Sequence, residues 1–313
     1  MLSTFDDIIK QQGFVILDGA LATELEARGA DLNHPLWSAK VLTENPLLIK
    51  QVNLDYLNAG ANIITTASYQ ASFMGFEKQG YSREEAIRLM QLSVEIAVEA
   101  RKEFLLNNVN NVIHYPIIAA SLGPYGAALA DGSEYKGYPN VPLSTLTAFH
   151  EERLNVITNT DADMLAFETI PCLNEAIAIK ELLHQYSSKK AWISFSCKDG
   201  LHLCNGELFE DAVKLLNNSN EIIGIGVNCT APQHIESLIK IAQPLTKKII
   251  LVYPNKGETY NAMDKKWDAS TECNPDFLQN AKFWLDAGAK AIGGCCRTTP
   301  ADIRQLNNLL FRK

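Results

Sequence analysis

The chain has 313 residues, of which 47% are hydrophobic and 20% charged, and its formal net charge is −8. This ordinary globular composition excludes disordered, collagen-like and coiled-coil proteins. The acidic balance, without any long run of Lys or Arg, makes nucleic acids and anionic membranes poor partners. No apolar run approaches the roughly 20 residues that a membrane-spanning helix requires.

The amino-terminal segment and the cysteines bear on the compartment. Residues 1–7 are acidic and lack the basic start and apolar core of a signal peptide. The seven cysteines are an odd number in a long chain, which does not suggest a disulfide framework. We therefore expect a cytoplasmic protein whose thiols are packing residues, metal ligands or nucleophiles.

Short apolar runs predict eight strands. They are apolar on both faces, which is typical of strands buried in a parallel sheet. Their ranges are 14–17, 62–66, 116–121, 164–167, 191–196, 222–227, 249–253 and 291–294. Helical patterns lie between them. One begins at the cap residue Asn45 and Pro46 and ends before Gly60, and another covers residues 84–104.

The number of strands and a faint internal repeat predict the fold. Eight strands in 313 residues give about 39 residues per unit, the scale of a (β/α)8 barrel. Residues 59–64 resemble residues 287–292, and residues 161–165 fit the same order of helix end, turn and strand. No change in composition marks a domain boundary. We predict an α/β fold, a single-domain TIM barrel over residues 1–313, with a doubly wound open sheet as the alternative.

A barrel of this kind carries its chemistry at the carboxyl ends of its strands. Polar and thiol side chains follow most of the predicted strands, as that arrangement requires. They are Asp18, Thr66, Ser68, Tyr69, Ser121, Glu168, Cys197, Asn228, Cys229, Tyr253, Asn255, Cys295 and Cys296.

The sharpest motif is Gly293-Gly294-Cys295-Cys296. Neighbouring strand residues point to opposite faces, so both thiols reach the barrel mouth only if the chain leaves the pleat, which two glycines permit. With Cys229, three thiols would suit tetrahedral zinc and leave a fourth position for catalysis. The alternative for any cysteine is a small buried packing residue. We assign that role to Cys172, Cys197, Cys204 and Cys273.

Two carboxylates follow predicted strands. Glu168 occupies the position that Cys295 has in the internal repeat, where it would bind a substrate ammonium or act as a base. Its alternative role is a salt bridge at the barrel rim. Asp18 would also bind substrate, and its alternative role is to cap the helix that begins near Ala20.

Residues 121–135 contain many turn residues and two tyrosines, Tyr125 and Tyr135. Long loops often bind ligands, and tyrosine faces attract organic cations such as sulfonium. The alternative is an ordered surface loop. The six histidines form no HExxH motif, and neither GxGxxG nor GxxxxGK occurs, which argues against zinc proteases and nucleotide-binding proteins.

Together these segments resemble the homocysteine S-methyltransferase family. The matching segments are 17–20, 23–25, 66–71, 121–126, 167–169, 226–229, 253–258 and 293–300. The joint occurrence of Val-Asn-Cys and Gly-Gly-Cys-Cys is the most specific part. Residues 130–135 and the short carboxyl tail look closest to the branch that uses S-methylmethionine, and the tail argues against the betaine-using branch.

The resemblance implies a (β/α)8 barrel with catalytic zinc (Zn²⁺) on Cys229, Cys295 and Cys296, and amino-acid binding by Asp18 and Glu168. Further substrate contacts are expected from Ser68, Tyr69, Ser121, Tyr125 and Asn228. The expected reaction moves a methyl group from S-methylmethionine, or S-adenosylmethionine, to the homocysteine thiolate and yields methionine. Selenohomocysteine as a second acceptor and the oligomeric state stay open. The alternatives are betaine as donor, a zinc-dependent hydrolase, and a non-catalytic thiol-binding or metal-storage protein.

Overall fold

The computed structural model describes residues 4–109, 112–186, 189–256, 259–261, 266–268 and 277–311. Within these residues, eight parallel strands form one sheet in the order β1-β10-β7-β6-β5-β4-β3-β2. A parallel bridge between Leu17 and Ile63 joins the β1 end of the sheet to β2 and closes it. The predicted (β/α)8 barrel is therefore confirmed, and the open-sheet alternative is wrong. The strands are β1 Val15–Ile16, β2 Ile63–Thr65, β3 Ile117–Leu122, β4 Met164–Ile170, β5 Ala191–Phe195, β6 Ile222–Asn228, β7 Ile249–Tyr253 and β10 Ala291–Ile292.

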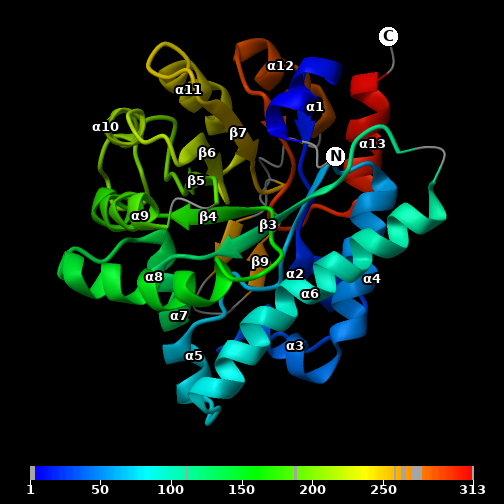
Figure 1. Ribbon diagram of the computed structural model, residues 1–313. Coiled ribbons are helices and arrows are strands. Elements are labelled where there is room, and N and C mark those ends of the chain that lie inside the picture. Colours follow the sequence, from blue (N-terminus) through cyan, green and yellow to red (C-terminus); the bar gives the residue numbers. More distant parts are fainter. Residues whose placement is uncertain are drawn as a thin grey trace.

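Helices surround the strands, and a separate antiparallel pair, β8 (Thr259–Asn261) and β9 (Lys266–Asp268), follows β7 (Figure 1). The α-helices are α1 Phe5–Gln12, α2 Leu21–Ala27, α3 Val41–Glu44, α4 Pro46–Ala59, α5 Phe73–Lys78, α6 Arg83–Asn107, α7 Tyr125–Leu129, α8 Leu143–Ile157, α9 Leu173–Gln185, α10 Phe209–Leu216, α11 Pro232–Ala242, α12 Phe277–Ala287 and α13 Pro300–Phe311. Two 3-10 turns are η1 Trp37–Lys40 and η2 Ser133–Tyr135.

Alternating strand residues divide the core into two layers. Val15, Ile63 and Trp192 belong to the inner layer, which Phe5 and Ile8 of α1 join. The neighbouring residues Ile16 and Ile64 belong to the larger layer between the strands and the outer helices. Because both faces of each strand are covered, the strands are apolar throughout, as the sequence predicted.

The helix termini also follow the sequence signals. The Asn45 side chain accepts a 3.2 Å hydrogen bond from the backbone N–H of Leu48, Pro46 begins α4, and Gly60 ends it with a φ of 105°. Helix α6 begins after Ser82, whose side chain and backbone form a capping box with Glu85. The expected helix at 84–104 is thus confirmed within a longer one.

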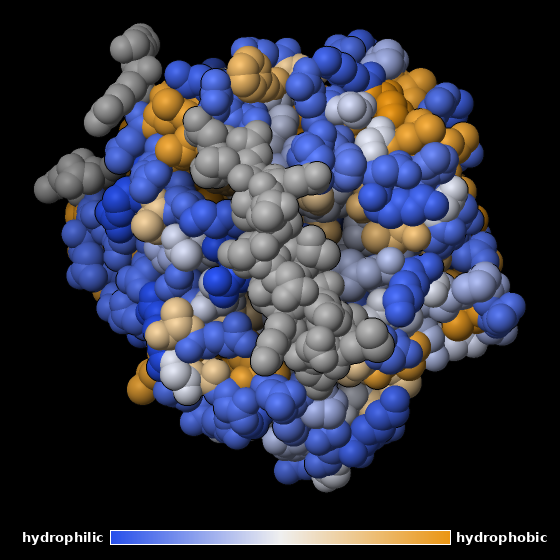
Figure 2. All heavy atoms as spheres, turned by 180° about the vertical axis from the view of Figure 1, so that it is seen from behind, coloured by the Kyte–Doolittle hydropathy of each residue, from blue (hydrophilic) through white to orange (hydrophobic). Residues whose placement is uncertain are grey.

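Apart from shifts of one residue at strand ends, the structure differs from the sequence-based boundaries in three places. Strand β4 continues to Ile170 instead of ending at residue 167, so Glu168 lies within the strand rather than after it. The predicted strand at 291–294 ends at Ile292. Residues 121–135 are not one loop, because α7 and η2 form within them. No helix in the described part of the chain is long and apolar enough to cross a membrane. On the face in Figure 2, hydrophilic residues predominate and apolar ones are scattered.

Candidate metal and substrate site

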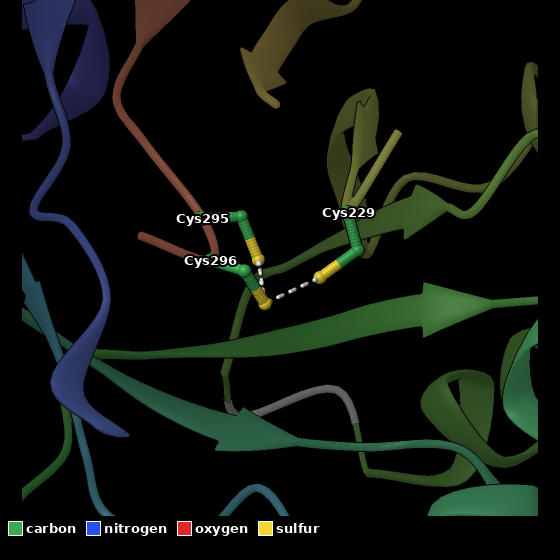
Figure 3. A group of neighbouring side chains, drawn as sticks. All are labelled: Cys229, Cys295 and Cys296. Atoms are coloured by element: carbon green, nitrogen blue, oxygen red, sulfur yellow. Dashed lines mark hydrogen bonds between the residues drawn. The ribbon is translucent and has the colours of Figure 1, made fainter. Parts of the chain in front are cut away.

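Three thiols meet at the carboxyl end of the barrel. Cys229 follows β6, and Cys295 and Cys296 follow β10 (Figure 3). The Sγ atom of Cys296 lies 3.9 Å from that of Cys229 and 4.0 Å from that of Cys295, and all three lie within 4.8 Å of one another. Sulfurs bound tetrahedrally to zinc at about 2.3 Å are about 3.8 Å apart. The three free thiols therefore fit three corners of a zinc tetrahedron.

These three thiols share their protons unequally when no metal is bound. Hydrogen bonds from Cys229 and Cys296 lower the pKa of Cys295 well below its usual value. The hydrogen bond with Cys295 raises the pKa of Cys229, and the hydrogen bonds with Cys229 and Cys295 raise that of Cys296. A bound metal ion would replace the thiol protons of the cluster.

Close packing explains the two glycines before the cysteine pair. A Cβ atom on Gly293 would lie 2.6 Å from the Cβ of Leu17 and 2.7 Å from the carbonyl oxygen of Asp18. A Cβ atom on Gly294 would lie 2.3 Å from the Thr298 hydroxyl oxygen. Neither glycine has a positive φ, so each is needed for close approach rather than for a left-handed backbone.

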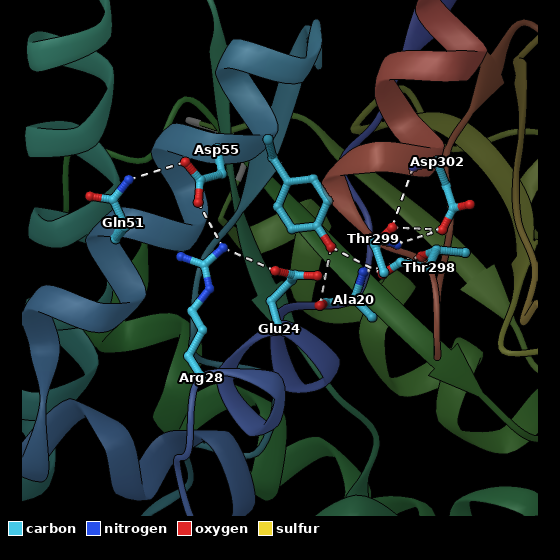
Figure 4. Close-up of polar contacts among 9 residues, drawn as sticks. Ala20, Glu24, Arg28, Gln51, Asp55, Thr298, Thr299 and Asp302 are labelled. Carbon is cyan, nitrogen blue, oxygen red and sulfur yellow. Dashed lines mark hydrogen bonds and ion pairs between the residues drawn. The ribbon is translucent and has the colours of Figure 1, made fainter.

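Neighbouring elements hold the cysteine loop (Figure 4). The Tyr56 hydroxyl on α4 contacts the carbonyl oxygen of Thr298 at 3.2 Å, and the Thr298 hydroxyl donates to the carbonyl oxygen of Cys295 at 2.6 Å. On α13, the Asp302 carboxylate accepts 2.9 Å hydrogen bonds from the Thr299 backbone N–H and hydroxyl. The loop that carries two of the thiols is thus fixed from both sides.

Two strained residues face each other across the β4 and β6 ends. Thr169 has a φ of 63° and Cys229 a φ of 47°, values that side chains with a Cβ rarely adopt. The β4–β5 register shifts between Phe167 and Ile170, so Thr169 lies in an irregularity of the strand. Asn228 accepts a 2.7 Å hydrogen bond from the Thr169 N–H and donates a 2.9 Å bond to its hydroxyl. Asn228 therefore stabilises the strained backbone beside the thiols.

Two carboxylates lie near Cys295. The Asp18 carboxylate accepts hydrogen bonds from the backbone N–H (2.6 Å) and hydroxyl (2.9 Å) of Thr65. The Glu168 carboxylate accepts a hydrogen bond from the hydroxyl of Ser121. Burial, together with a smaller effect of the Cys295 charge, raises the pKa of Asp18 to about 7 and that of Glu168 to about 8.

The structure contradicts the two non-functional alternatives for these carboxylates. The N-cap residue of α2 is Ala20, and no side chain caps that helix, so Asp18 is not a helix cap. Glu168 is only 8% exposed and, within the described part of the chain, forms no ion pair. A buried carboxylate without a protein cation is well suited to a ligand's ammonium group.

Most of the other residues that are expected to contact substrate lie at the carboxyl end of the barrel. Ser68, Ser121 and Asn228 are buried at the barrel end, where the Ser68 hydroxyl donates to the carbonyl oxygen of Ser121 at 2.7 Å. Burial raises the pKa of Tyr69, as do the charges of Glu134 and Cys229, whereas a side-chain hydrogen bond with Thr169 lowers it, so the Tyr69 phenol lies at the end of β4 beside Thr169.

Tyr125 belongs to an aromatic cluster. Its ring lies 5.6 Å from that of Tyr138 and 5.4 Å from that of Phe149, measured between centroids. Its backbone N–H donates to the buried Glu175 carboxylate at 2.6 Å. These contacts connect Tyr125 to α8 and α9, and its contact with a substrate stays a prediction.

Sequence reasoning did not select two neighbouring residues, Glu134 and Tyr135, as site residues. Burial raises the pKa of Tyr135, as do the charges of Cys229 and Cys296, so its phenol lies within electrostatic reach of the thiols. The available signals were the tyrosine-containing loop 121–135, in which Tyr135 was considered for binding a sulfonium, and the segment 130–135, which served to indicate the branch of the family.

The other cysteines have packing roles where the structure describes them. Cys172 and Cys197 are buried, and burial raises the pKa of Cys172 to about 12 and that of Cys204 above its usual value. Cys273 lies outside the described residues.

Comparisons with known proteins identify the family of the chain. The family model for homocysteine S-methyltransferase matches residues 15–310. Homocysteine S-methyltransferase YbgG of Bacillus subtilis is 48% identical over 306 residues, which cover 97% of each chain. Selenocysteine Se-methyltransferase of Brassica oleracea var. italica is 45% identical over 318 residues, covering 98% of this chain and 92% of the relative. The metallated form of the homocysteine methyltransferase MmuM from Escherichia coli has a TM-score of 0.86 and 41% identity, covering 96% of this chain and 98% of that one. The chain therefore belongs to the homocysteine S-methyltransferase family and is a methyltransferase.

Proposed function

We propose that the protein transfers a methyl group from S-methylmethionine to homocysteine at a zinc ion held by Cys229, Cys295 and Cys296. The observation that carries this proposal is the separation of 3.9–4.0 Å between neighbouring thiols at the barrel mouth. That spacing, together with a donor set made only of soft sulfur ligands, suits zinc. When bound, zinc would supply a Lewis acid that keeps the homocysteine sulfur in its nucleophilic thiolate form at neutral pH.

The acceptor's ammonium group is assigned to Asp18 and Glu168. Thr65 orients the first carboxylate and Ser121 the second. Both pKa values are raised by burial, so an ammonium group that enters between them favours their ionised forms. The pair would thereby orient homocysteine with its sulfur toward the thiol cluster.

Methyl transfer requires alignment more than proton transfer. The homocysteine sulfur forms a bond to the donor's methyl carbon, and the bond from that carbon to the sulfonium sulfur breaks. Its electron pair stays on the departing sulfur, which becomes a neutral thioether. With S-methylmethionine both products are methionine. The rings of Tyr69 and Tyr135, near the thiols, would attract the sulfonium before transfer.

The donor and the acceptor range form the finer part of the proposal. S-methylmethionine is preferred because residues 130–135 resemble that branch, whereas S-adenosylmethionine carries the same reacting group. The Brassica oleracea relative is named for a selenocysteine acceptor, which supports assaying selenohomocysteine as well. The free thiols of the described residues fit a reducing compartment such as the cytoplasm.

Methionine formation tests the proposal. Zinc-loaded protein is incubated with homocysteine and with S-methylmethionine, S-adenosylmethionine or betaine in parallel. Turnover with S-methylmethionine is expected. Turnover with another donor alone would overturn the donor assignment, and no turnover with any donor would overturn the proposed reaction.

Two cysteine variants test the assignment of the metal ligands. Cys295→Ser should lose both bound zinc and turnover, because only two of the three sulfur ligands remain to hold the ion. Cys172→Ser is the matched control, since Cys172 is also a free thiol but is buried at the start of α9. The control should keep its zinc content and activity. A Cys295→Ser protein with full zinc content would contradict the assignment.

A further inference from the structure

Glu134 in η2 is half-buried, and one of its carboxylate oxygens lacks a partner. Its Oε2 atom is buried and has no hydrogen-bond partner among the described residues. Burial, together with a smaller effect of the Asp131 charge, raises its pKa to about 7. No cation of the described residues lowers that pKa. Asp18 and Glu168, by contrast, have hydroxyl donors from Thr65 and Ser121.

The turn that carries Glu134 is fixed by the fold. The Ser196 hydroxyl, after β5, donates to the carbonyl oxygen of Glu134 at 3.2 Å. A Cβ atom on Gly126 of α7 would lie 2.6 Å from the Glu134 backbone nitrogen. A Cβ atom on Gly137 would lie 2.5 Å from the Cβ of Asn205. The turn is thus packed between α7 and the segment after β5, which keeps the Oε2 atom of Glu134 buried.

Glu134 lies close to the strand ends that carry the thiols. The Ser196 hydroxyl, which contacts the Glu134 carbonyl oxygen, also lies 3.4 Å from the carbonyl oxygen of Thr169, the residue that Asn228 holds beside Cys229. The Glu134 charge acts on the phenols of Tyr69 and Tyr135, and the charge of Cys229 acts on the same two phenols. Two phenols therefore lie within electrostatic reach of both this carboxylate and the thiol cluster.

Asp18 and Glu168 form a separate pair near Cys295. The backbone N–H of Gly294, which precedes Cys295, donates to the Asp18 carbonyl oxygen at 3.0 Å. The charge of Cys295 acts on both carboxylates, and that of Asp18 acts on Glu168. Glu134 is thus a further acidic group besides this pair, which suits a reaction between two amino acids with ammonium groups.

We propose that Glu134 binds the α-ammonium group of the methyl donor, while the faces of Tyr69 and Tyr135 receive its sulfonium. This inference rests on the proposed function and names the donor subsite. The unpaired Oε2 atom needs a hydrogen-bond donor, which an ammonium group supplies and a trialkylsulfonium does not. A cation without N–H groups is instead attracted by aromatic faces. Glu134 then favours sulfonium donors that carry an amino group over donors that lack one.

The test compares Glu134→Gln with Asp131→Asn. Gln keeps the size of the side chain and removes its charge. Asp131→Asn is the matched control, because it removes a charge from the same turn at an exposed site, and Asn can still accept from the Ser133 N–H. Thermal unfolding and zinc content are measured for both variants to establish that each is folded and loaded.

The substrates separate the donor subsite from the rest of the site. For Glu134→Gln the KM of S-methylmethionine should rise about tenfold or more, the scale of one lost charge-assisted hydrogen bond. The KM of homocysteine should stay within about twofold, and so should that of dimethylsulfoniopropionate, a sulfonium donor without an ammonium group. Glu134→Asp, which keeps the charge, should restore part of the preference for S-methylmethionine. Asp131→Asn should match the wild type.

Other results would contradict the donor subsite, the choice of donor or both proposals. An unchanged KM for S-methylmethionine, or equal rises for both sulfonium donors, would overturn the subsite while leaving the proposed reaction intact. Wild-type turnover with S-adenosylmethionine alone would move the same comparison to that donor, which also has an α-ammonium group. Wild-type turnover with betaine alone would overturn both proposals, because betaine has no N–H group.

Discussion

Replacing Asn228 by Ala tests the idea that one amide holds the strained strand ends together. The Asn228 side chain accepts hydrogen bonds from the Thr169 N–H at 2.7 Å and the Ser194 hydroxyl at 2.8 Å, and it donates to the Thr169 hydroxyl at 2.9 Å. Alanine removes all three. The Ser194 hydroxyl keeps a partner in the Tyr253 hydroxyl, whereas the Thr169 N–H loses its acceptor.

The expected loss follows from these contacts. An unsatisfied buried N–H costs about 1–3 kcal/mol, and two further hydrogen bonds contribute about 1 kcal/mol each. Relaxation of the positive φ at Thr169 offsets about 1 kcal/mol. The free energy of unfolding should therefore fall by about 3 kcal/mol. Glu168 and Cys229 lie next to the released residues, so zinc affinity and turnover should fall as well.

Urea denaturation measures the change, and Asn53→Ala is the matched control. Asn53 and Asn228 are each only 2% exposed, but the Nδ2 atom of Asn53 has no hydrogen-bond partner among the described residues. Removing that amide should cost about 1 kcal/mol or less. Equal losses for the two variants, or full zinc binding by Asn228→Ala, would refute the role assigned to Asn228.

Three further predictions concern the cysteine loop, a buried acid and the metal. Tyr56→Phe removes the hydroxyl that contacts the Thr298 carbonyl oxygen, so the free energy of unfolding should fall by about 1 kcal/mol. A chelator should also remove zinc faster from this variant. An unchanged rate of zinc release would show that other contacts fix the loop. In metal-free protein the pKa of Asp18 is raised to about 7, above its unfolded value, so its contribution to stability is complete below about pH 4 and is lost as the pH rises through 7. Asp18→Asn lacks this loss, so its melting temperature should rise relative to that of the wild type as the pH increases from about 5 to about 8. A difference in melting temperature that does not change with pH would contradict the assignment. Zinc at 100 times its Kd should add about 2.7 kcal/mol to the stability of chelated protein, and an unchanged Tm on zinc addition would argue against a folded-state metal site.

The sequence by itself determined the barrel and the cysteine cluster. Runs that are apolar on both faces mark strands covered on both sides, and Asn45, Pro46 and Gly60 mark helix ends through local backbone chemistry. Carboxyl ends of parallel strands meet at one end of a barrel, so Cys229 and the Cys295-Cys296 pair were expected to converge. These signals are local or follow from strand order, so they are visible without coordinates.

Only the tertiary structure decided how the surrounding groups are paired. Nothing in the local sequence indicates that Asp18 accepts from Thr65 rather than capping α2, or that Asn228 holds the strained Thr169. Burial of the Glu134 Oε2 atom likewise depends on the packing of η2 against α7 and on the Ser196 hydroxyl. The hydrogen bonds among these contacts join residues 47 to 62 positions apart in the chain. Their formation depends on which side chains the closed barrel brings within hydrogen-bond distance, and that distance is set by packing rather than by sequence periodicity.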